Sequence, residues 1–450
     1  MTVDSMFARL LLITGLLFSG AVLAGPKIQS WQTANGARVL FVPAPEIPMV
    51  DVRVVFDAGS ARDDGKSGVT SFTNTLLSQG AGEWNARQVA ERLESVGSQL
   101  DSGALRDMAW VSARSLTEPK ALNVTLETLA KILADPRFET ADIERERQSI
   151  LASLLSDEQS PGSIGQKRLY HMVFGNHPYA DDPEGTSASV KSITREDILA
   201  TYKRLYVAKN ALVAIVGAVD RAQAEAIANQ LTAGLSAGEH APPLPSVKPL
   251  QQAEVERISF PSTQTHLYLG QPGMMRGDPD YFPLYVGNHI LGGSGLVSLL
   301  SDEVREKRGL SYSVYSYFLP MRQTGIFQLG LQTKNAQAGE ALKVLTATLR
   351  RFIDEGPTDA ELTAAKQNIT GGFPLRIASN SKIVEYLSVI GFYDLPLDYL
   401  DTFTQKVNAV TKAQIQDAFE RRIHPDRLAT VQVGRLDTPV AQAQAGSPGD

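Results

Sequence analysis

Residues 290–315 read ILGGSGLVSLLSDEVREKRGLSYSVY, a glycine-rich turn followed by a helical and then an extended pattern. Residues 312–318 are aromatic-rich and alternating, which predicts a strand. The preceding pattern predicts an amphipathic helix that ends at Arg308 and Gly309. We therefore expect Arg308 and Tyr312 to lie together at a helix-to-strand corner. Four apolar residues recur at the helical spacing: Leu296, Leu299, Leu300 and Val304.

Arg308 and Tyr312 each have two interpretations from chemistry alone. An arginine at a helix C-terminus stabilises the helix dipole, and a strand tyrosine is ordinarily half-buried packing. Alternatively, both side chains donate hydrogen bonds to a bound substrate or to a developing oxyanion. The glycine cluster before them lacks the Gly-Lys-Ser/Thr of a phosphate loop, so we interpret it as a tight turn.

The corner closely resembles the C-terminal half of the insulinase/pitrilysin-like zinc metallopeptidases. The resemblance is carried by the helix, the run Arg-Glu-Lys-Arg-Gly-Leu and the following Tyr-Ser-Val-Tyr. In that family an arginine and a tyrosine at this corner help to hold the substrate peptide. The resemblance therefore implies a substrate-binding role for Arg308 and Tyr312.

The composition is that of a globular protein. With 450 residues and 43% hydrophobic content, the chain can form at least two domains with sizeable cores. The net charge of -6 comes from interspersed charges, so nucleic acid is not an expected partner. There is no cysteine, which excludes disulfides, thiolate metal sites and cysteine nucleophiles.

Residues 1–24 read as a signal peptide. Arg9 precedes an apolar run over residues 10–18, and small residues over 21–24 offer a cleavage site before Gly25. An uncleaved anchor is the alternative, but the apolar run is shorter than the roughly 20 residues that a spanning helix needs. We expect a cleaved signal and a periplasmic or secreted protein without a later membrane span.

A helix beginning near Gly68 stands where active members of the family carry His-x-x-Glu-His. Residues at i and i+4 share a helix face, so two histidines there can both bind zinc, and the glutamate activates its water. Alignment through Gly68 and Phe72 places Ser71, Asn74 and Thr75 at these three positions. Hydroxyl groups are poor zinc ligands and an amide cannot act as a general base, so the motif is degenerate.

The third zinc ligand is missing as well. In the family a glutamate follows a helix segment that corresponds to residues 143–150, but residues 151–153 here are Leu-Ala-Ser. His171 and His177, with nearby carboxylates, are an alternative metal site, and solvated loop structure is the simpler interpretation. The carboxylates near these two histidines are Asp181, Asp182 and Glu184. We expect this chain to bind no metal.

Two segments of the chain recur in the same order. Residues 190–198 align with 407–415 at an offset of 217, and residues 143–150 align with 362–369 at an offset of 219. Two matches in one order indicate an internal duplication. We therefore predict an α+β fold of two duplicated domains, each a mostly antiparallel sheet with helices packed on one face.

The predicted domain boundaries follow from the repeat. The N-terminal domain with the degenerate zinc motif covers residues 25–240, and the C-terminal domain with the arginine-tyrosine corner covers 251–437. Residues 241–250 form a proline-rich, semi-rigid linker between them. Residues 438–450 read as a disordered tail.

A blank zinc motif beside an intact corner resembles the non-catalytic subunit of the family's two-chain peptidases. The resemblance implies a zinc-bearing homologous partner, a peptide substrate, and hydrolysis to which Arg308 and Tyr312 contribute from this chain. One alternative is a purely structural or peptide-binding scaffold of the same fold. The other, hydrolysis by this chain alone, lacks any evident nucleophile-base spacing.

Overall fold

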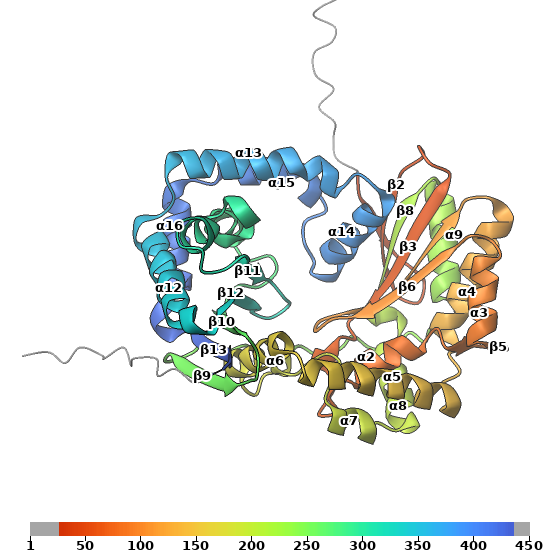
Figure 1. The fold of residues 1–450 in the computed structure, drawn as a ribbon. Coiled ribbons are helices and arrows are strands. Elements are labelled where there is room, and N and C mark those ends of the chain that lie inside the picture. Colours follow the sequence, from red (N-terminus) through yellow and green to blue (C-terminus); the bar gives the residue numbers. More distant parts are fainter. Residues whose placement is uncertain (1–26, 436–450) are drawn as a thin grey trace, which may run out of the picture.

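The computed structural model describes residues 27–435, so the predicted signal peptide and tail lie outside the described residues. A six-stranded sheet forms the first half of the molecule (Figure 1). Its strands pair antiparallel except for β2 and β8, which run parallel. In spatial order they are β1 (Gln29–Gln32), β2 (Arg38–Pro43), β8 (Ala211–Gly217), β3 (Met49–Phe56), β7 (Ala109–Leu116) and β6 (Gln99–Ala104).

A five-stranded sheet forms the second half. It too is antiparallel except for one pair, β13 and β9. Its order matches strand by strand the order β6-β7-β3-β8-β2 of the first sheet, with the parallel pair at the same end. Its strands are β11 (Val314–Leu319), β12 (Ile326–Lys334), β10 (Gln264–Pro272), β13 (Ala429–Gly434) and β9 (Glu254–Ser259).

The helices repeat with the strands. α8 (Arg195–Leu205) and α16 (Lys412–Arg422) start 217 residues apart, and each begins with a threonine capping box, at Thr194 and Thr411. α5 (Thr140–Glu158) and α13 (Asp359–Arg376) start 219 residues apart. The predicted α+β fold of two duplicated, mostly antiparallel domains is confirmed.

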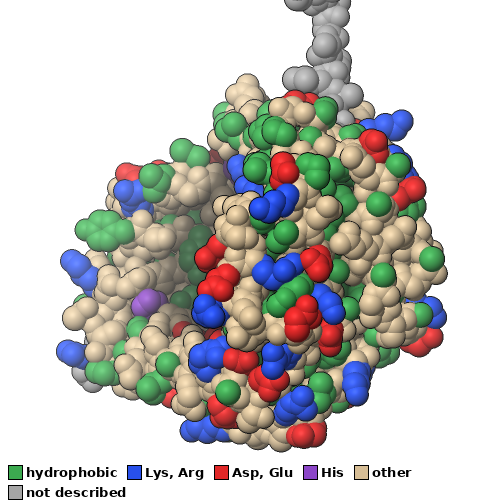
Figure 2. Space-filling view, turned by 90° about the vertical axis from the view of Figure 1, so that its right-hand side faces the viewer, with side chains coloured by type: hydrophobic (Ala, Val, Ile, Leu, Met, Phe, Trp, Pro, Cys, Tyr) green, Lys and Arg blue, Asp and Glu red, His purple; other side chains and the backbone are tan. Residues whose placement is uncertain are grey.

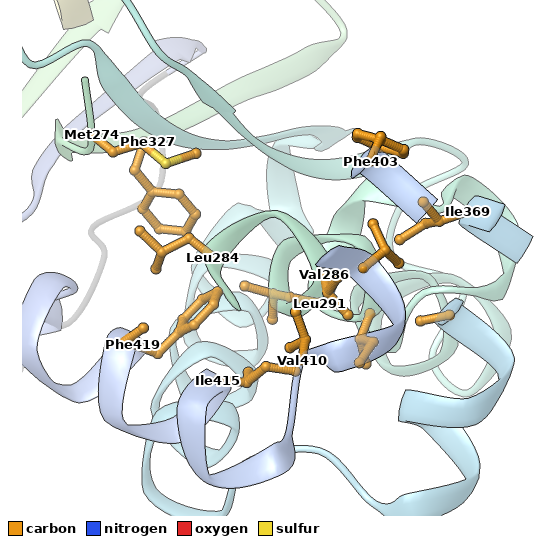
Figure 3. Close-up of a cluster of buried hydrophobic side chains, with 14 of the residues drawn as sticks. Met274, Leu284, Val286, Leu291, Phe327, Ile369, Phe403, Val410, Ile415 and Phe419 are labelled. Carbon is orange, nitrogen blue, oxygen red and sulfur yellow. The ribbon is translucent and has the colours of Figure 1, made fainter. Parts of the chain in front are cut away.

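Each half packs its own helices on one face of its sheet. On the first sheet the apolar sides of these helices share one buried cluster with alternate residues of β2, β3 and β8. In the second half, Phe419 on α16 belongs to the core shown in Figure 3, and its ring lies edge-on to that of Phe352 at 5.0 Å. The helices are α3 (Ala86–Glu94), α4 (Pro119–Ala134) and α9 (Arg221–Thr232), and, in the second half, α10 (Tyr281–Asn288), α12 (Ala338–Glu355) and α16.

The opposite face of each sheet is covered by a helix from the other half. α6 (Pro161–Phe174) packs on β10 and β13, whereas α14 (Asn380–Phe392) packs on β8 and β3. These helices begin 219 residues apart, so they are equivalent elements of the repeat. The approach is close, since a Cβ added at Gly391 of α14 would lie 2.6 Å from the Leu212 side chain.

A buried polar cluster around Asp107 also joins the halves. Its carboxylate accepts hydrogen bonds from the Tyr179 hydroxyl, the Tyr393 hydroxyl at 2.9 Å and the backbone N–H of Arg322 at 2.7 Å. Residues 241–250, the predicted linker, contain no helix or strand, and their Leu244 side chain is buried. The two halves are thus held together by helices, hydrogen bonds and a packed connection.

The surface of the first half carries mixed charges. In Figure 2, Lys and Arg side chains alternate with Asp and Glu side chains over this half, and a hollow opens beside it toward the second half. Within residues 27–435, no helix is long and apolar enough to cross a bilayer.

Candidate functional site

Helix α2 (Val69–Leu76) carries the positions of the degenerate zinc motif. It begins after Gly68, whose φ of 92° favours glycine, and the Asp63 carboxylate accepts hydrogen bonds from the backbone N–H groups of Gly68 at 2.7 Å and Thr70 at 3.0 Å. Burial raises the pKa of Asp63 to about 6, although these hydrogen bonds oppose the rise. The helix start is therefore fixed by a buried carboxylate.

Asn74 occupies the position of the family's glutamate and is 1% exposed. Its Nδ2 donates to the carbonyl oxygens of Gly103 at 3.0 Å and Trp110 at 3.3 Å, and its Oδ1 accepts from the Tyr206 hydroxyl at 3.0 Å. Every polar atom of this amide has a partner inside the protein. Asn74 therefore links α2 to β6, β7 and the end of α8.

Ser71 and Thr75, at the two histidine positions, are half-buried. The Thr75 hydroxyl donates to the Ser71 carbonyl oxygen at 3.1 Å, a bond within the helix. On the neighbouring helix α5, residues 151–153 offer no carboxylate. Two hydroxyls and an engaged amide do not fit a zinc ion, because none supplies an imidazole or carboxylate ligand.

His177 of the alternative metal site holds a turn. Its Nδ1 accepts from the backbone N–H of Tyr179 at 3.1 Å, and its Nε2 lies 2.9 Å from the Pro245 carbonyl oxygen. Burial lowers the pKa of His177. Across residues 27–435, no three His, Asp or Glu side chains are grouped so that they could hold a metal ion.

The corner is more irregular than its sequence predicts. A separate turn comes first, the helix then runs without a break over residues 299–306, and β11 begins at Val314, so Tyr312 lies in the loop before the strand. Leu300 and Val304 are buried as predicted, but Leu296 is 63% exposed because it lies in a separate turn that Gly295, with φ of 63°, introduces. The segments are η5 (Gly295–Val297), α11 (Leu299–Ser301) and η6 (Asp302–Glu306).

Arg308 is held by an acidic residue of its own segment. Its Nη1 donates to the Glu303 carboxylate at 2.5 Å and to the Glu303 carbonyl oxygen at 2.7 Å. Lys307 and Arg351 also donate to this carboxylate. Hydrogen bonds from Lys307, and then from Arg308 and Arg351, lower the pKa of Glu303 to about 2. The Arg308 side chain remains 39% exposed.

Tyr312 is 87% exposed, and Val297 of the same stretch is 82% exposed. No described residue makes a hydrogen bond or ring contact with the Tyr312 side chain. The half-buried packing that a strand tyrosine ordinarily shows is therefore absent. The phenol is free to meet another molecule.

Arg305 is a candidate that the sequence interpretation missed. Its side chain is 33% exposed, and its ion pair is a 3.6 Å contact with the adjacent Glu306. It precedes Arg308 by three residues, so helical spacing alone places both arginines near one face. The two arginines differ in that Glu303 binds Arg308 closely.

The candidate residues divide between the halves. Ser71, Asn74 and Thr75 belong to α2 on the first sheet, whereas Arg308 and Tyr312 precede β11, the edge strand of the second sheet. The structure describes both regions but does not combine them into one hydrolytic centre. Among residues 27–435, no group of potential zinc ligands accompanies the corner.

Comparisons with known proteins identify the family and the fold. Residues 38–187 match the family model of insulinase (peptidase family M16), and residues 192–369 match that of the peptidase M16 inactive domain. The crystal structure of a peptidase M16 inactive domain from Pseudomonas fluorescens is 37% identical, with a TM-score of 0.88 over 91% of this chain and 98% of that one.

More distant relatives are described as proteases. An uncharacterized zinc protease of Streptomyces coelicolor is 26% identical over 78% of this chain and 77% of its own length. A protease from Helicobacter pylori is 20% identical over 91% of this chain and 99% of that one, and its TM-score of 0.84 shows the same fold. The chain belongs to the insulinase family, peptidase family M16, and resembles its inactive type.

Proposed function

We propose that this chain is the non-catalytic subunit of a heteromeric zinc metallopeptidase. A homologous partner supplies the zinc and its activating glutamate, and this chain supplies Arg308 and Tyr312 to bind the peptide. The observation that carries the proposal is the contrast in exposure. Asn74 is 1% exposed with every polar atom engaged, whereas Tyr312 is 87% exposed without a partner among the described residues.

The chemistry of the corner suits a bound peptide. A guanidinium and a phenol are hydrogen-bond donors, and a peptide backbone offers carbonyl oxygens, one of which becomes an oxyanion during hydrolysis. Hydrogen-bond donors that are already in place when the oxyanion forms lower the activation barrier of hydrolysis. Arg305 supplies a second guanidinium on the same segment, with a weaker internal contact than that of Arg308.

The direct test is reconstitution. The mature chain is co-expressed with a homologue that carries His-x-x-Glu-His, chosen first from the adjacent reading frames. Each protein and the mixture are then assayed on a fluorogenic peptide library. We expect hydrolysis by the mixture well above that of the homologue alone, none by this chain alone, and one zinc per complex.

Two outcomes contradict the proposal. Chelator-sensitive hydrolysis by this chain alone would mean that it is a peptidase in its own right. A stable complex whose activity equals that of the homologue alone would favour the scaffold alternative.

We also propose that the protein works in the periplasm or outside the cell after removal of residues 1–24. N-terminal sequencing of the protein from a periplasmic fraction is expected to begin at Gly25. A mature protein that retains Arg9 and partitions with the membrane would instead mean that residues 10–18 anchor it.

A further inference from the structure

A cavity of about 570 Å³ lies among four helices of the second half. Its walls come from α10, the end of α13, α14 and α15 (Tyr399–Ala409), and Arg276 enters from the loop after β10. The cavity is distinct from the corner and from α2, since it contains none of their residues. Its lining is rich in tyrosine and carries three cations, Arg276, Arg376 and Lys382, with one carboxylate, Glu385.

The three cations have no carboxylate partner within residues 27–435. Arg376 donates to the Tyr285 hydroxyl at 2.8 Å, and Lys382 donates to the Leu375 carbonyl oxygen at 2.9 Å. Arg276 lies near the face of Tyr393 at 5.4 Å, and its buried Nε has no hydrogen-bond partner. Among the described residues, the Arg276 guanidinium therefore has neither a carboxylate partner nor an acceptor at Nε, and the part of this side chain that lines the cavity can meet an added acceptor.

The carboxylates closest in sequence to Arg276 are already engaged. Asp278 lies 2.5 Å from Arg422, and Asp280 lies 3.0 Å from Arg421. These ion pairs direct both acids toward α16. Arg276 is therefore left facing the cavity although two carboxylates follow it within four residues.

The walls of the cavity suit a ligand whose main part is apolar or aromatic. The rings of Tyr281 and Tyr285 are parallel within 5° at 5.8 Å, and Phe403 extends this surface. Burial raises the pKa of Tyr285 and of Tyr386, so their hydroxyls stay protonated and can donate. A flat surface beside unpaired cations complements a carboxylate that is attached to an apolar group.

A second cavity of about 290 Å³ continues from the first. The two share Arg276, Glu385 and Val389, and the second reaches Arg53 and Trp110 on the first sheet. The guanidinium of Arg53 stacks on Trp110 at 4.4 Å, and its buried Nε has no hydrogen-bond partner among residues 27–435. An extended ligand whose end lies at Arg276 can therefore continue between the halves.

We propose that this cavity binds a carboxylate carried on an apolar body, with Arg276 as its principal ligand. The two sources of this chemistry are the C-terminus of a peptide and a small aromatic acid. The adjoining cavity favours the peptide, because a longer ligand gains further contacts there. Binding at this site requires neither zinc nor a partner subunit, so it goes beyond the proposed function and is testable on this chain alone.

The test is calorimetric titration of the full mature chain with two matched pairs of probes. One pair is N-acetyl-phenylalanine and its amide, and the other is a pentapeptide ending in phenylalanine, as free acid and as amide. We expect that an acid that binds does so at least about tenfold more tightly than its matched amide. The peptide acid binding more tightly than the amino acid would identify a peptide C-terminus, and the reverse would identify a small acid.

Variants locate the site. Arg276→Gln is expected to remove the preference for acid over amide, and Tyr386→Phe is expected to weaken acid binding, because it removes a hydroxyl that lines the cavity and hydrogen-bonds Arg376. Arg87→Gln, at an exposed arginine of α3, is the control and should change neither. Equal affinity for acid and amide, no binding of either acid, or an unchanged preference in folded Arg276→Gln would overturn the proposal.

Discussion

Helix α2 and the corner before β11 differ in where their polar side chains find partners. On α2, the Asn74 amide, which the sequence aligns with the family's glutamate, is engaged by three groups of the protein. At the corner, Tyr312 is almost fully exposed and Arg305 has one long contact. The polar side chain of Asn74 is thus used inside the protein, whereas Tyr312 and part of Arg308 are exposed.

The largest expected effect is on catalysis at the corner. In the reconstituted complex, Tyr312→Phe and Arg308→Ala should each lower kcat by roughly 10²-fold, because each removes a donor to the substrate or its oxyanion. Steady-state kinetics with matched zinc content measures this, and Arg87→Ala is the control. Arg305→Ala is the sharper comparison, since a loss confined to that variant would assign the role to Arg305 and not to Arg308.

The next effect is on stability and belongs to α2. Asn74→Ala should lower the free energy of unfolding by about 2–3 kcal/mol, because it leaves the Tyr206 hydroxyl and two carbonyl oxygens without their partner. Thr75→Ala, one residue on and half-buried, should cost less than about 1 kcal/mol. Urea denaturation of both variants measures the difference. Equal losses would mean that Asn74 is not the structural link described above.

The contact between α14 and the first sheet, which helps to hold the two halves together, gives a third comparison. Gly391→Ala should destabilise the protein by about 1–3 kcal/mol, since its methyl group meets Leu212 on the first sheet. Gly371, in α13, has no atom within 4 Å of an added Cβ, so Gly371→Ala should stabilise by about 0.5–1 kcal/mol. Thermal unfolding of the pair tests the packing of α14, and two stabilising substitutions would contradict it.

The smallest effect is a pH dependence at the start of α2. The pKa of Asp63 is raised from 3.8 to about 6, so this residue's contribution to stability is fully present below the unfolded pKa and is lost as the pH rises through 6. Between pH 7 and 5, folding should gain about 1 kcal/mol from this group. The gain is measured as the difference between wild type and Asp63→Asn, and parallel pH profiles would refute it.

The duplication was predictable because it is recorded in local residue types. The offsets near 217 and 219 identify equivalent helices, and their caps at Thr194 and Thr411 repeat with them. The details of the corner were not predictable in this way. Leu296 has the spacing of a core residue, yet Gly295 turns the chain and leaves it exposed.

The remaining features depend on contacts between distant parts of the chain. α6 and α14 pack on the sheet of the other half, a contact between segments far apart in the chain that the local residue pattern of neither helix specifies. Arg308 and Glu303 are close in sequence, but the sequence does not show which cation Glu303 binds, because three cations contact its carboxylate. The unpaired state of Arg276 follows only once the partners of Asp278 and Asp280 are known.

The reciprocal placement of α6 and α14 has a consequence for how this protein responds to proteolysis. A cut within residues 241–250 would break the covalent connection, but each fragment would still have one helix seated on the sheet of the other. The nicked protein should therefore migrate as one species until a denaturant is added. Either fragment produced alone would expose a sheet face to water and should aggregate.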